Sequence, residues 1–98
     1  MKTDIKKISV ILKNELPKLQ TDYCVATLEI FGSYVRNEQK MDSDLDILVS
    51  FTEPPGLFKF INLENHLSDL LGINVDLVMR SALKPTIGKR IISEAQPI

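Results

Sequence analysis

Two aspartates, Asp44 and Asp46, stand two residues apart in the stretch Ser-Asp-Leu-Asp-Ile-Leu-Val. A Gly32-Ser33 pair precedes them, and Asp76 follows in Val-Asp-Leu. A glycine-serine turn suits phosphate binding, because glycine lets backbone N–H groups approach an anion closely. Carboxylate oxygens are the ligands that Mg²⁺ prefers. Together these residues predict metal-dependent chemistry on a nucleoside triphosphate.

The electrostatics of the three aspartates strengthen the metal prediction. Two carboxylates ~4 Å apart repel by about 4 kcal/mol at an effective dielectric of ~20, so a fold tolerates the cluster only with a shared proton or a cation. Oxygen ligands and phosphate substrates favour Mg²⁺ or Mn²⁺ over zinc. A site with two Mg²⁺ ions could orient the attacking oxygen and stabilise the leaving pyrophosphate. We therefore expect Asp44, Asp46 and Asp76 to be both metal ligands and catalytic residues.

Strand periodicity explains how these aspartates can meet. Successive side chains of a strand point to opposite faces, so a strand over 44–51 separates two sets of residues. The set expected to face helices is Leu45, Ile47, Val49 and Phe51. The set expected to face away is Asp44, Asp46, Leu48 and Ser50. Residues 74–79 repeat this pattern. If the two strands are neighbours with a common core face, Asp76 lies beside Asp44 and Asp46.

Apolar periodicity predicts the remaining elements. In chain order they are a helix that starts at Thr3 or Asp4 and carries apolar residues to Leu19, a strand over 25–31, a short turn-and-helix segment after Gly32, the strand over 44–51, a helix over 57–71 that stops at Gly72, the strand over 74–79, and a helix from Pro85 or Thr86 to about Ala95. Helices and strands alternate without a linker or repeat, which predicts one α/β unit over residues 1–98.

The composition is typical of a soluble globular protein, with 44% hydrophobic and 26% charged residues. The net charge of −1 gives no reason to expect direct binding to nucleic acid. Cys24 is the single cysteine, which excludes a disulfide framework and fits a reducing cytosol. No apolar run approaches the ~20 residues of a membrane span. We expect a cytoplasmic protein without a membrane segment.

Simpler explanations exist for each aspartate. A polar turn at 42–44 explains Asp42 but leaves Asp46, inside the strand, unexplained. A calcium loop that starts at Asp42 is excluded, because its sixth position requires glycine and is Ile47 here. Asp76 can also be a lone surface carboxylate, and the sequence leaves this alternative open.

Several other residues have weaker functional interpretations. Arg36 can reach a phosphate bound at Gly32 and Ser33, or it can be an exposed helix cation. His66 is expected on a helix as a solvated or partly packed residue, and Cys24 as a small buried hydrophobe. A basic C-terminal region can contact the triphosphate or an acidic partner, or simply be solvated; it contains Arg80, Lys84, Lys89 and Arg90.

The pattern Gly32-Ser33-(two residues)-Arg36, then Ser43-Asp44-Leu45-Asp46, then Val75-Asp76-Leu77 resembles the nucleotidyltransferase superfamily that includes DNA polymerase beta. The short length and the ending near Leu83-Lys84-Pro85 resemble the minimal nucleotidyltransferases, which are the antitoxin halves of HEPN/MNT toxin–antitoxin modules. The resemblance covers nearly the whole chain. It implies a single small nucleotidyltransferase-type domain over 1–98, with a mixed β-sheet of three or four strands flanked by helices.

The resemblance also implies roles for the residues. In that family the Gly-Ser turn holds the β- and γ-phosphates, which corresponds to Gly32 and Ser33. The first two aspartates ligate metal, which corresponds to Asp44 and Asp46. The third, matching Asp76, completes the metal site and helps to deprotonate the acceptor hydroxyl. The resemblance implies that this chain, like such antitoxins, transfers AMP from ATP to a tyrosine of a HEPN ribonuclease toxin encoded nearby. The modification inactivates the toxin. The resemblance therefore also implies a hetero-oligomer.

One position departs from the family pattern. Many relatives have Ala-Arg-Gly-Glu where this chain has Val35-Arg36-Asn37-Glu38. Asparagine tolerates positive φ better than most residues, so we expect the turn to survive. The substitution puts the catalytic rate in question more than the metal site.

Two other functions compete with protein adenylylation. A catalytically weak or inactive antitoxin would neutralise its toxin by binding alone. Nucleotidyl transfer to a small hydroxylated molecule such as an aminoglycoside is disfavoured, because the chain has no room for a helical substrate-binding domain. A macromolecular partner must then supply much of the recognition, and exposed apolar helix residues can form the contact.

Overall fold

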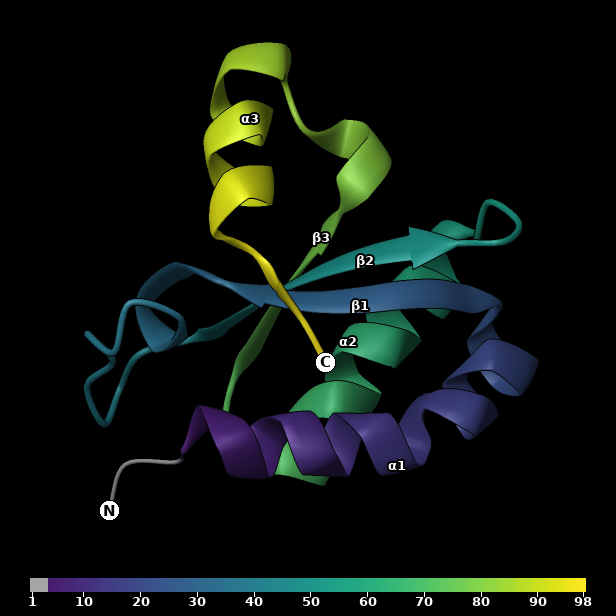
Figure 1. The fold of residues 1–98 in the computed structure, drawn as a ribbon. Coiled ribbons are helices and arrows are strands. Elements are labelled where there is room, and N and C mark those ends of the chain that lie inside the picture. Colours follow the sequence, from purple (N-terminus) through teal and green to yellow (C-terminus); the bar gives the residue numbers. More distant parts are fainter. Residues whose placement is uncertain (1–3) are drawn as a thin grey trace.

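The computed structural model describes residues 4–98 (Figure 1). The elements in chain order are α1 (Ile5–Tyr23), β1 (Val25–Phe31), the 3₁₀ turn η1 (Gly32–Tyr34), β2 (Leu45–Phe51), α2 (Leu57–Leu71), β3 (Val75–Met79), the 3₁₀ turn η2 (Arg80–Ala82), α3 (Pro85–Glu94) and β4 (Gln96–Pro97). Strand β1 and helix α2 have the bounds that the sequence predicts. Strands β2 and β3 each begin one residue later than expected, and α3 ends at Glu94.

The four strands form one mixed sheet in the order β3-β2-β1-β4. Strand β1 is antiparallel to both β2 and β4, whereas β2 and β3 are parallel and are connected through α2. The predicted α/β fold with a mixed sheet is therefore confirmed. The short strand β4 is an addition to the three strands located from the sequence.

Helices α1 and α2 cover one face of the sheet, and α3 lies on the opposite side (Figure 1). The hydrophobic core fills the space between the sheet and the first two helices. Its fully buried side chains come from alternate strand residues and from the inner faces of these helices; they include Ile8, Leu12, Leu19, Ile30, Leu45, Ile47, Val49, Leu63 and Leu67. This is the face that strand periodicity assigns to the core.

The ends of α1 show how local sequence sets the element bounds. The Asp4 side chain accepts a hydrogen bond from the Lys6 N–H at 3.0 Å and caps the first turn. At the other end, Cys24 has φ +57°, and its N–H donates to the Leu19 carbonyl. Cys24 is only half-buried, so the expectation of a small buried hydrophobe was wrong. Its backbone ends the helix in the left-handed conformation, which sequence periodicity does not reveal. Thr3, the alternative cap, lies outside the described residues.

Side chains of α2 hold the outer edge of β3. The Val75 N–H donates to Ser68 Oγ at 3.0 Å, and the Leu77 N–H donates to Glu64 Oε2 at 2.9 Å. An edge strand otherwise leaves such donors without partners. These bonds fix the strand that carries Asp76 between its two neighbours, α2 and β2.

Among the residues that the structure describes, no helix is both long and apolar enough to cross a membrane.

Candidate active site

Asp46 and Asp76 occupy directly opposite positions on the parallel strands β2 and β3. Both lie on the face of the sheet that α1 and α2 leave uncovered. The pKa of Asp46 is raised from 3.8 to about 6. Partial burial is the largest cause, the Asp76 and Asp44 charges and a hydrogen bond with Asp76 act in the same direction, and the Arg36 charge opposes the shift. The position of Asp46 in the sheet therefore disfavours the ionised form of its carboxyl group.

Gly32 provides the surface against which Asp46 rests. Its φ of +82° is in the region that favours glycine, and a Cβ at this position would overlap Asp46 Oδ2. The register of β1 and β2, which pairs Phe31 with Asp46, explains this proximity. Only glycine allows the turn after β1 to approach the Asp46 carboxylate so closely.

The turn that follows Gly32 is a compact 3₁₀ turn rather than the start of a longer helix. The N–H groups of Val35 and Arg36 donate to the Gly32 carbonyl at 3.1 and 3.2 Å, and the Glu38 N–H donates to the Ser33 carbonyl at 2.8 Å. Ser33 directly follows the glycine that contacts Asp46, and its role in phosphate binding stays a prediction.

Asn37 closes the same segment in the left-handed conformation. Its φ is +58°, a value that asparagine tolerates better than most residues. The expectation that asparagine preserves the turn in place of the family's glycine is confirmed for the backbone.

Asp44 has a hydrogen-bond partner outside the aspartate group. It immediately precedes β2, and its Oδ1 accepts a hydrogen bond from Asn74 Nδ2 at 2.9 Å. Its charge still reaches the site: burial raises the pKa of Tyr34 and the Asp44 charge adds to that shift, and the same charge contributes to the raised pKa of Asp46. Asp44 thus acts on the site electrostatically, while its carboxylate is held by an amide.

Asp46 interacts with both of the other predicted aspartates, with Asp76 through charge and a hydrogen bond and with Asp44 through charge. Within residues 4–98, no group of three or more His, Cys, Asp or Glu side chains has the geometry of a metal site. That Asp44, Asp46 and Asp76 together hold a cation therefore stays a prediction.

The donor set nevertheless fits a hard divalent cation. Carboxylate oxygens from Asp46 and Asp76 are adjacent, and Asp44 is within electrostatic range. A positive charge at this point would offset both the burial and the repulsion that raise the pKa of Asp46, and oxygen ligands favour Mg²⁺ or Mn²⁺.

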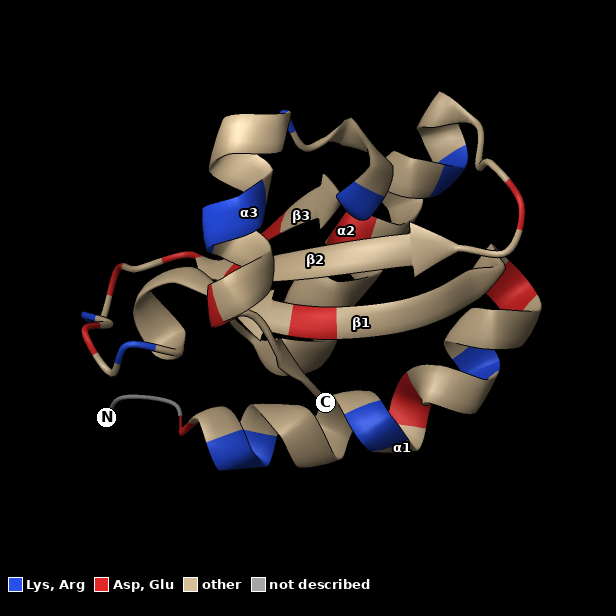
Figure 2. Ribbon diagram, turned by 45° about the horizontal axis from the view of Figure 1, so that its top comes forward, with Lys and Arg blue, Asp and Glu red and all other residues tan. Residues whose placement is uncertain are grey.

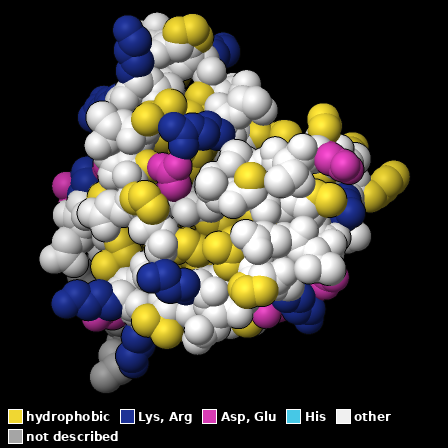
Figure 3. All heavy atoms as spheres, turned by 45° about the vertical axis from the view of Figure 1, so that its right-hand side comes forward, with side chains coloured by type: hydrophobic (Ala, Val, Ile, Leu, Met, Phe, Trp, Pro, Cys, Tyr) yellow, Lys and Arg dark blue, Asp and Glu magenta, His cyan; other side chains and the backbone are white. Residues whose placement is uncertain are grey.

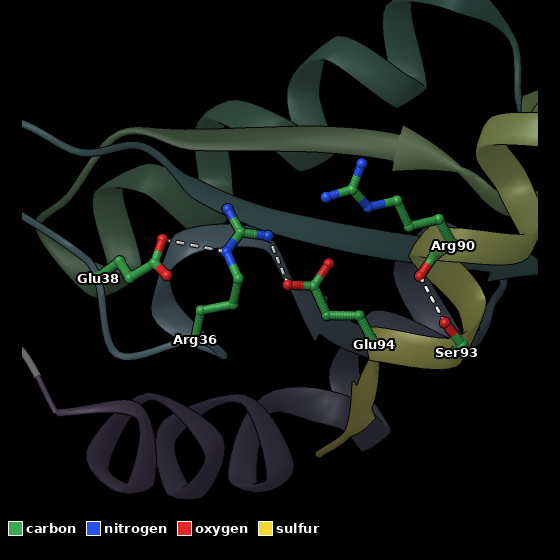
Figure 4. A network of polar contacts seen from close by, with 5 residues as sticks. All are labelled: Arg36, Glu38, Arg90, Ser93 and Glu94. Carbon is green, nitrogen blue, oxygen red and sulfur yellow. Dashed lines mark hydrogen bonds and ion pairs between the residues drawn. The ribbon is translucent and has the colours of Figure 1, made fainter.

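Arg36 leaves the turn and forms two ion pairs (Figure 4). Its Nε donates to Glu38 Oε2 at 3.2 Å, and its Nη1 donates to Glu94 Oε1, at the end of α3, at 2.6 Å. Arg36 is also close enough to Asp46 to lower the pKa of that carboxyl. No sequence pattern indicates Glu94, because a contact between residues so far apart in the chain leaves no local signal.

The other conspicuous polar residues lie away from the aspartates. His66 Nε2 lies 3.1 Å from Glu15 Oε2, and its ring stacks on Tyr23, with 5.9 Å between centroids. His66 is thus a partly packed helix residue, as expected. Arg80 of the basic C-terminal region pairs with Glu29 of β1 at 2.5 Å. Figure 2 shows Lys and Arg dispersed over α1, α3 and the connections, without a single basic face.

A cavity of about 270 Å³ lies at the other end of β2 and β3 from the aspartates. It is lined by Val49, Ser50, Phe51, Pro54, Met79 and Ser81. Its distance along the strands from Asp46 and Asp76 separates it from the carboxylate pair, so it is not the centre of the predicted chemistry.

Comparisons with known proteins agree with this arrangement. The nucleotidyltransferase domain family matches residues 5–98. The protein adenylyltransferase MntA of Thermococcus cleftensis is 49% identical, over 92% of this chain and 91% of that protein. A solved structure provisionally described as a minimal nucleotidyltransferase is 32% identical with a TM-score of 0.83, and the match covers 98% of this chain and 97% of that chain.

A more distant similarity is to a complex of tri-AMPylated HEPN toxin with MNT antitoxin from Shewanella oneidensis. It has a TM-score of 0.64 and 21% identity, and it covers 91% of this chain and 70% of that chain, so it shows the fold alone. The family model and the 49% identical relative each span almost all of the described residues. The chain therefore belongs to the nucleotidyltransferase family, as one of its minimal members, and is an enzyme of that class.

Proposed function

We propose that this chain is a Mg²⁺-dependent protein adenylyltransferase that acts as an antitoxin. It transfers AMP from ATP to a tyrosine hydroxyl of a partner HEPN ribonuclease toxin encoded nearby, and the modification inactivates the toxin. The observation that carries the proposal is the Asp46–Asp76 pair held against the Gly32 turn. The names of the relatives support the transferred group and the partner.

The residues divide the work between metal and phosphate binding. Asp46 and Asp76, with Asp44 beside them, would hold Mg²⁺, with two ions expected and Mn²⁺ as a substitute. The metal would neutralise negative charge on the triphosphate and on the leaving pyrophosphate. Gly32 and Ser33 would bind the β- and γ-phosphates through backbone N–H groups and the serine hydroxyl.

The transfer is a substitution at the α-phosphorus of ATP. The tyrosine oxygen forms a new bond to this phosphorus, and the bond to pyrophosphate breaks. The phenol proton leaves with help from Asp76, whose carboxylate lies next to Asp46. The products are an AMP-tyrosine ester and pyrophosphate, so atoms and charge balance without a further reactant.

The partner's own surface would supply much of the acceptor recognition. We take residues 1–98 as one nucleotidyltransferase domain, whose helices within residues 4–98 are α1, α2 and α3. Figure 3 shows apolar side chains exposed at several separate places with charged residues between them. Among the exposed apolar helix residues, Leu57 and Phe58 at the start of α2 are the most exposed neighbouring pair, and such residues can form the contact with the toxin. The resulting hetero-oligomer would be cytoplasmic and would not require nucleic acid.

Mass spectrometry tests the proposal directly. The purified chain, ATP, Mg²⁺ and the neighbouring gene product should give a toxin heavier by whole AMP units, located on tyrosine. Asp44→Asn and Asp46→Asn should abolish the gain, whereas Asp42→Asn in the preceding turn should retain it. An unchanged gain in the first two variants would reject the site.

Neutralisation by binding alone is the second candidate. It is favoured by one observation, the hydrogen bond that Asn74 donates to the Asp44 carboxylate. In that case a variant with both Asp44→Asn and Asp46→Asn would protect cells from the toxin fully, and no ATP would be consumed. Adenylylation predicts that the same variant loses protection.

A further inference from the structure

The ion pair between Arg36 and Glu94 connects the turn after β1 to the last residue of α3. The Arg36 Nη1 to Glu94 Oε1 distance is 2.6 Å, and the Glu94 side chain is 19% exposed. The second pair, with Glu38, is longer at 3.2 Å, and the Glu38 side chain is 64% exposed. Solvent screens the pair with Glu38 more strongly, so Glu94 has the greater influence on the position of Arg36.

The two glutamates engage only part of the Arg36 guanidinium. Nε donates to Glu38 and Nη1 donates to Glu94, which leaves the N–H groups of Nη2 without a partner among residues 4–98. Figure 4 shows this third nitrogen pointing away from both glutamates. A guanidinium held in this way keeps donors in a fixed geometry, which suits a phosphate oxygen.

Glu94 makes this contact although its own helix offers another cation. Arg90 lies one turn earlier on α3, at the spacing where helix ion pairs usually form. Within the described chain, Arg90 forms no ion pair, and Ser93 Oγ donates to its backbone carbonyl (Figure 4). Glu94 therefore pairs with Arg36 rather than with Arg90. Strand β4 begins two residues after Glu94 and pairs with Glu29 and Ile30 of β1, which fixes the position of the end of α3.

We propose that Glu94 is a positioning residue of the nucleotide site, which holds Arg36 so that its free Nη2 donates to the triphosphate. This makes α3 part of the active site, although none of its residues belongs to the sequence motif. The inference rests on the proposed function, since it assigns the phosphate of ATP as the ligand of Arg36.

The test is a double-mutant cycle read by calorimetry of AMP-PNP binding with Mg²⁺ to the purified chain. Glu94→Gln should raise the Kd about tenfold, equivalent to roughly 1.4 kcal/mol. Arg36→Gln should raise it by at least as much. The double variant should be no weaker than Arg36→Gln alone, because a residue that acts only through Arg36 has no effect once Arg36 is gone.

Kinetics and a matched control separate positioning from general damage. In the transfer assay, Glu94→Gln should raise the KM for ATP about tenfold and leave kcat within about twofold. Glu38→Gln removes the other, more exposed partner of the same arginine and should change the Kd by less than about twofold. Far-UV circular dichroism and the melting temperature should be close to wild type for each variant.

An unchanged or lower Kd in Glu94→Gln would overturn the inference, and so would additive losses in the double variant. The proposed function survives these outcomes if the wild-type chain still transfers AMP. A wild-type chain that neither binds AMP-PNP nor transfers AMP would overturn both.

Discussion

The two faces of the sheet differ sharply although they are built from the same strands. On the face that α1 and α2 cover, Leu45 and Ile47 are fully buried in a continuous apolar cluster. On the other face, Asp46, the residue between them, lies beside Asp76, and its pKa is raised to about 6. Strand alternation thus separates a face that stabilises the fold from one that holds poorly compensated charge.

The uncovered face is not uniformly polar. Leu48, which follows Asp46 on the same side of β2, is 1% exposed yet lies outside the main core cluster. Its register partners are Glu29 on β1 and Val78 on β3, and Glu29 pairs with Arg80. The charge that the fold leaves uncompensated is therefore confined to the end of β2 and β3 where the Gly32 turn approaches.

The largest expected effect comes from Asp76→Asn on the uncovered face. Removing a carboxylate from the proposed metal and proton-transfer site should lower the rate of AMP transfer by about 10³-fold. The free energy of unfolding, from urea titration, should not fall, because the variant removes repulsion with Asp46. A large loss of stability with normal transfer would reverse the assignment of the two faces.

The adjacent residue on the same strand, Leu77, provides the opposite case. Leu77 is 5% exposed within the core cluster, so Leu77→Ala should lower the free energy of unfolding by about 2–4 kcal/mol. Transfer per folded molecule should stay within a few-fold of wild type at a temperature where the variant is folded. If this core substitution lowered the transfer rate as much as Asp76→Asn does, the separation of the faces would fail.

Gly32→Ala should affect both stability and activity. The methyl group would occupy the position of Asp46 Oδ2, and alanine at φ +82° is strained. We expect a loss of about 1–3 kcal/mol in the free energy of unfolding and a marked fall in transfer. Gly56→Ala, where a Cβ meets nothing within 4 Å, is the matched control and should be close to neutral.

The smallest effect is a pH dependence of the metal-free protein. Because the folded-state pKa of Asp46 is raised from 3.8 to about 6, the folded chain binds this proton more tightly than the unfolded chain does. The resulting stability is complete below pH ~4 and is lost as the pH rises through 6. After allowance for solvent screening we expect about 1 kcal/mol.

This pH effect can be isolated by difference. In chelator-treated samples, the free energy of unfolding is measured by urea titration at each pH. Between pH 4 and 7 it should decline more in wild type than in Asp46→Asn. Equal pH profiles for wild type and Asp46→Asn would mean that Asp46 ionises without penalty. The proposed electrostatic need for a cation would then be wrong.

The sequence predicted those features that depend on local periodicity. The two-residue period of β2 and β3 correctly assigned the core face, and the glycine after Leu71 marked the end of α2. The placement of Asp46 and Asp76 on one face also followed from strand alternation, whereas their direct pairing depends on the strand register that the structure shows.

Features that depend on distant partners could not be predicted in the same way. The Asn74 amide donates to Asp44, Arg36 donates to Glu94, and Glu64 with Ser68 accepts the N–H groups at the edge of β3. Each of these contacts follows from three-dimensional packing, and the residues carry no local signal of it. The left-handed backbone of Cys24 is a further case, since asparagine or glycine would be the usual indicator.

The most direct test of the central claim is an NMR titration of the wild-type chain with Mn²⁺ in the presence of AMP-PNP. Paramagnetic broadening should appear first at the amides of Gly32, Asp46 and Asp76 and should be absent in Asp46→Asn. Broadening centred on the cavity near Ser50 and Ser81, with Asp46 and Asp76 unaffected, would contradict the account.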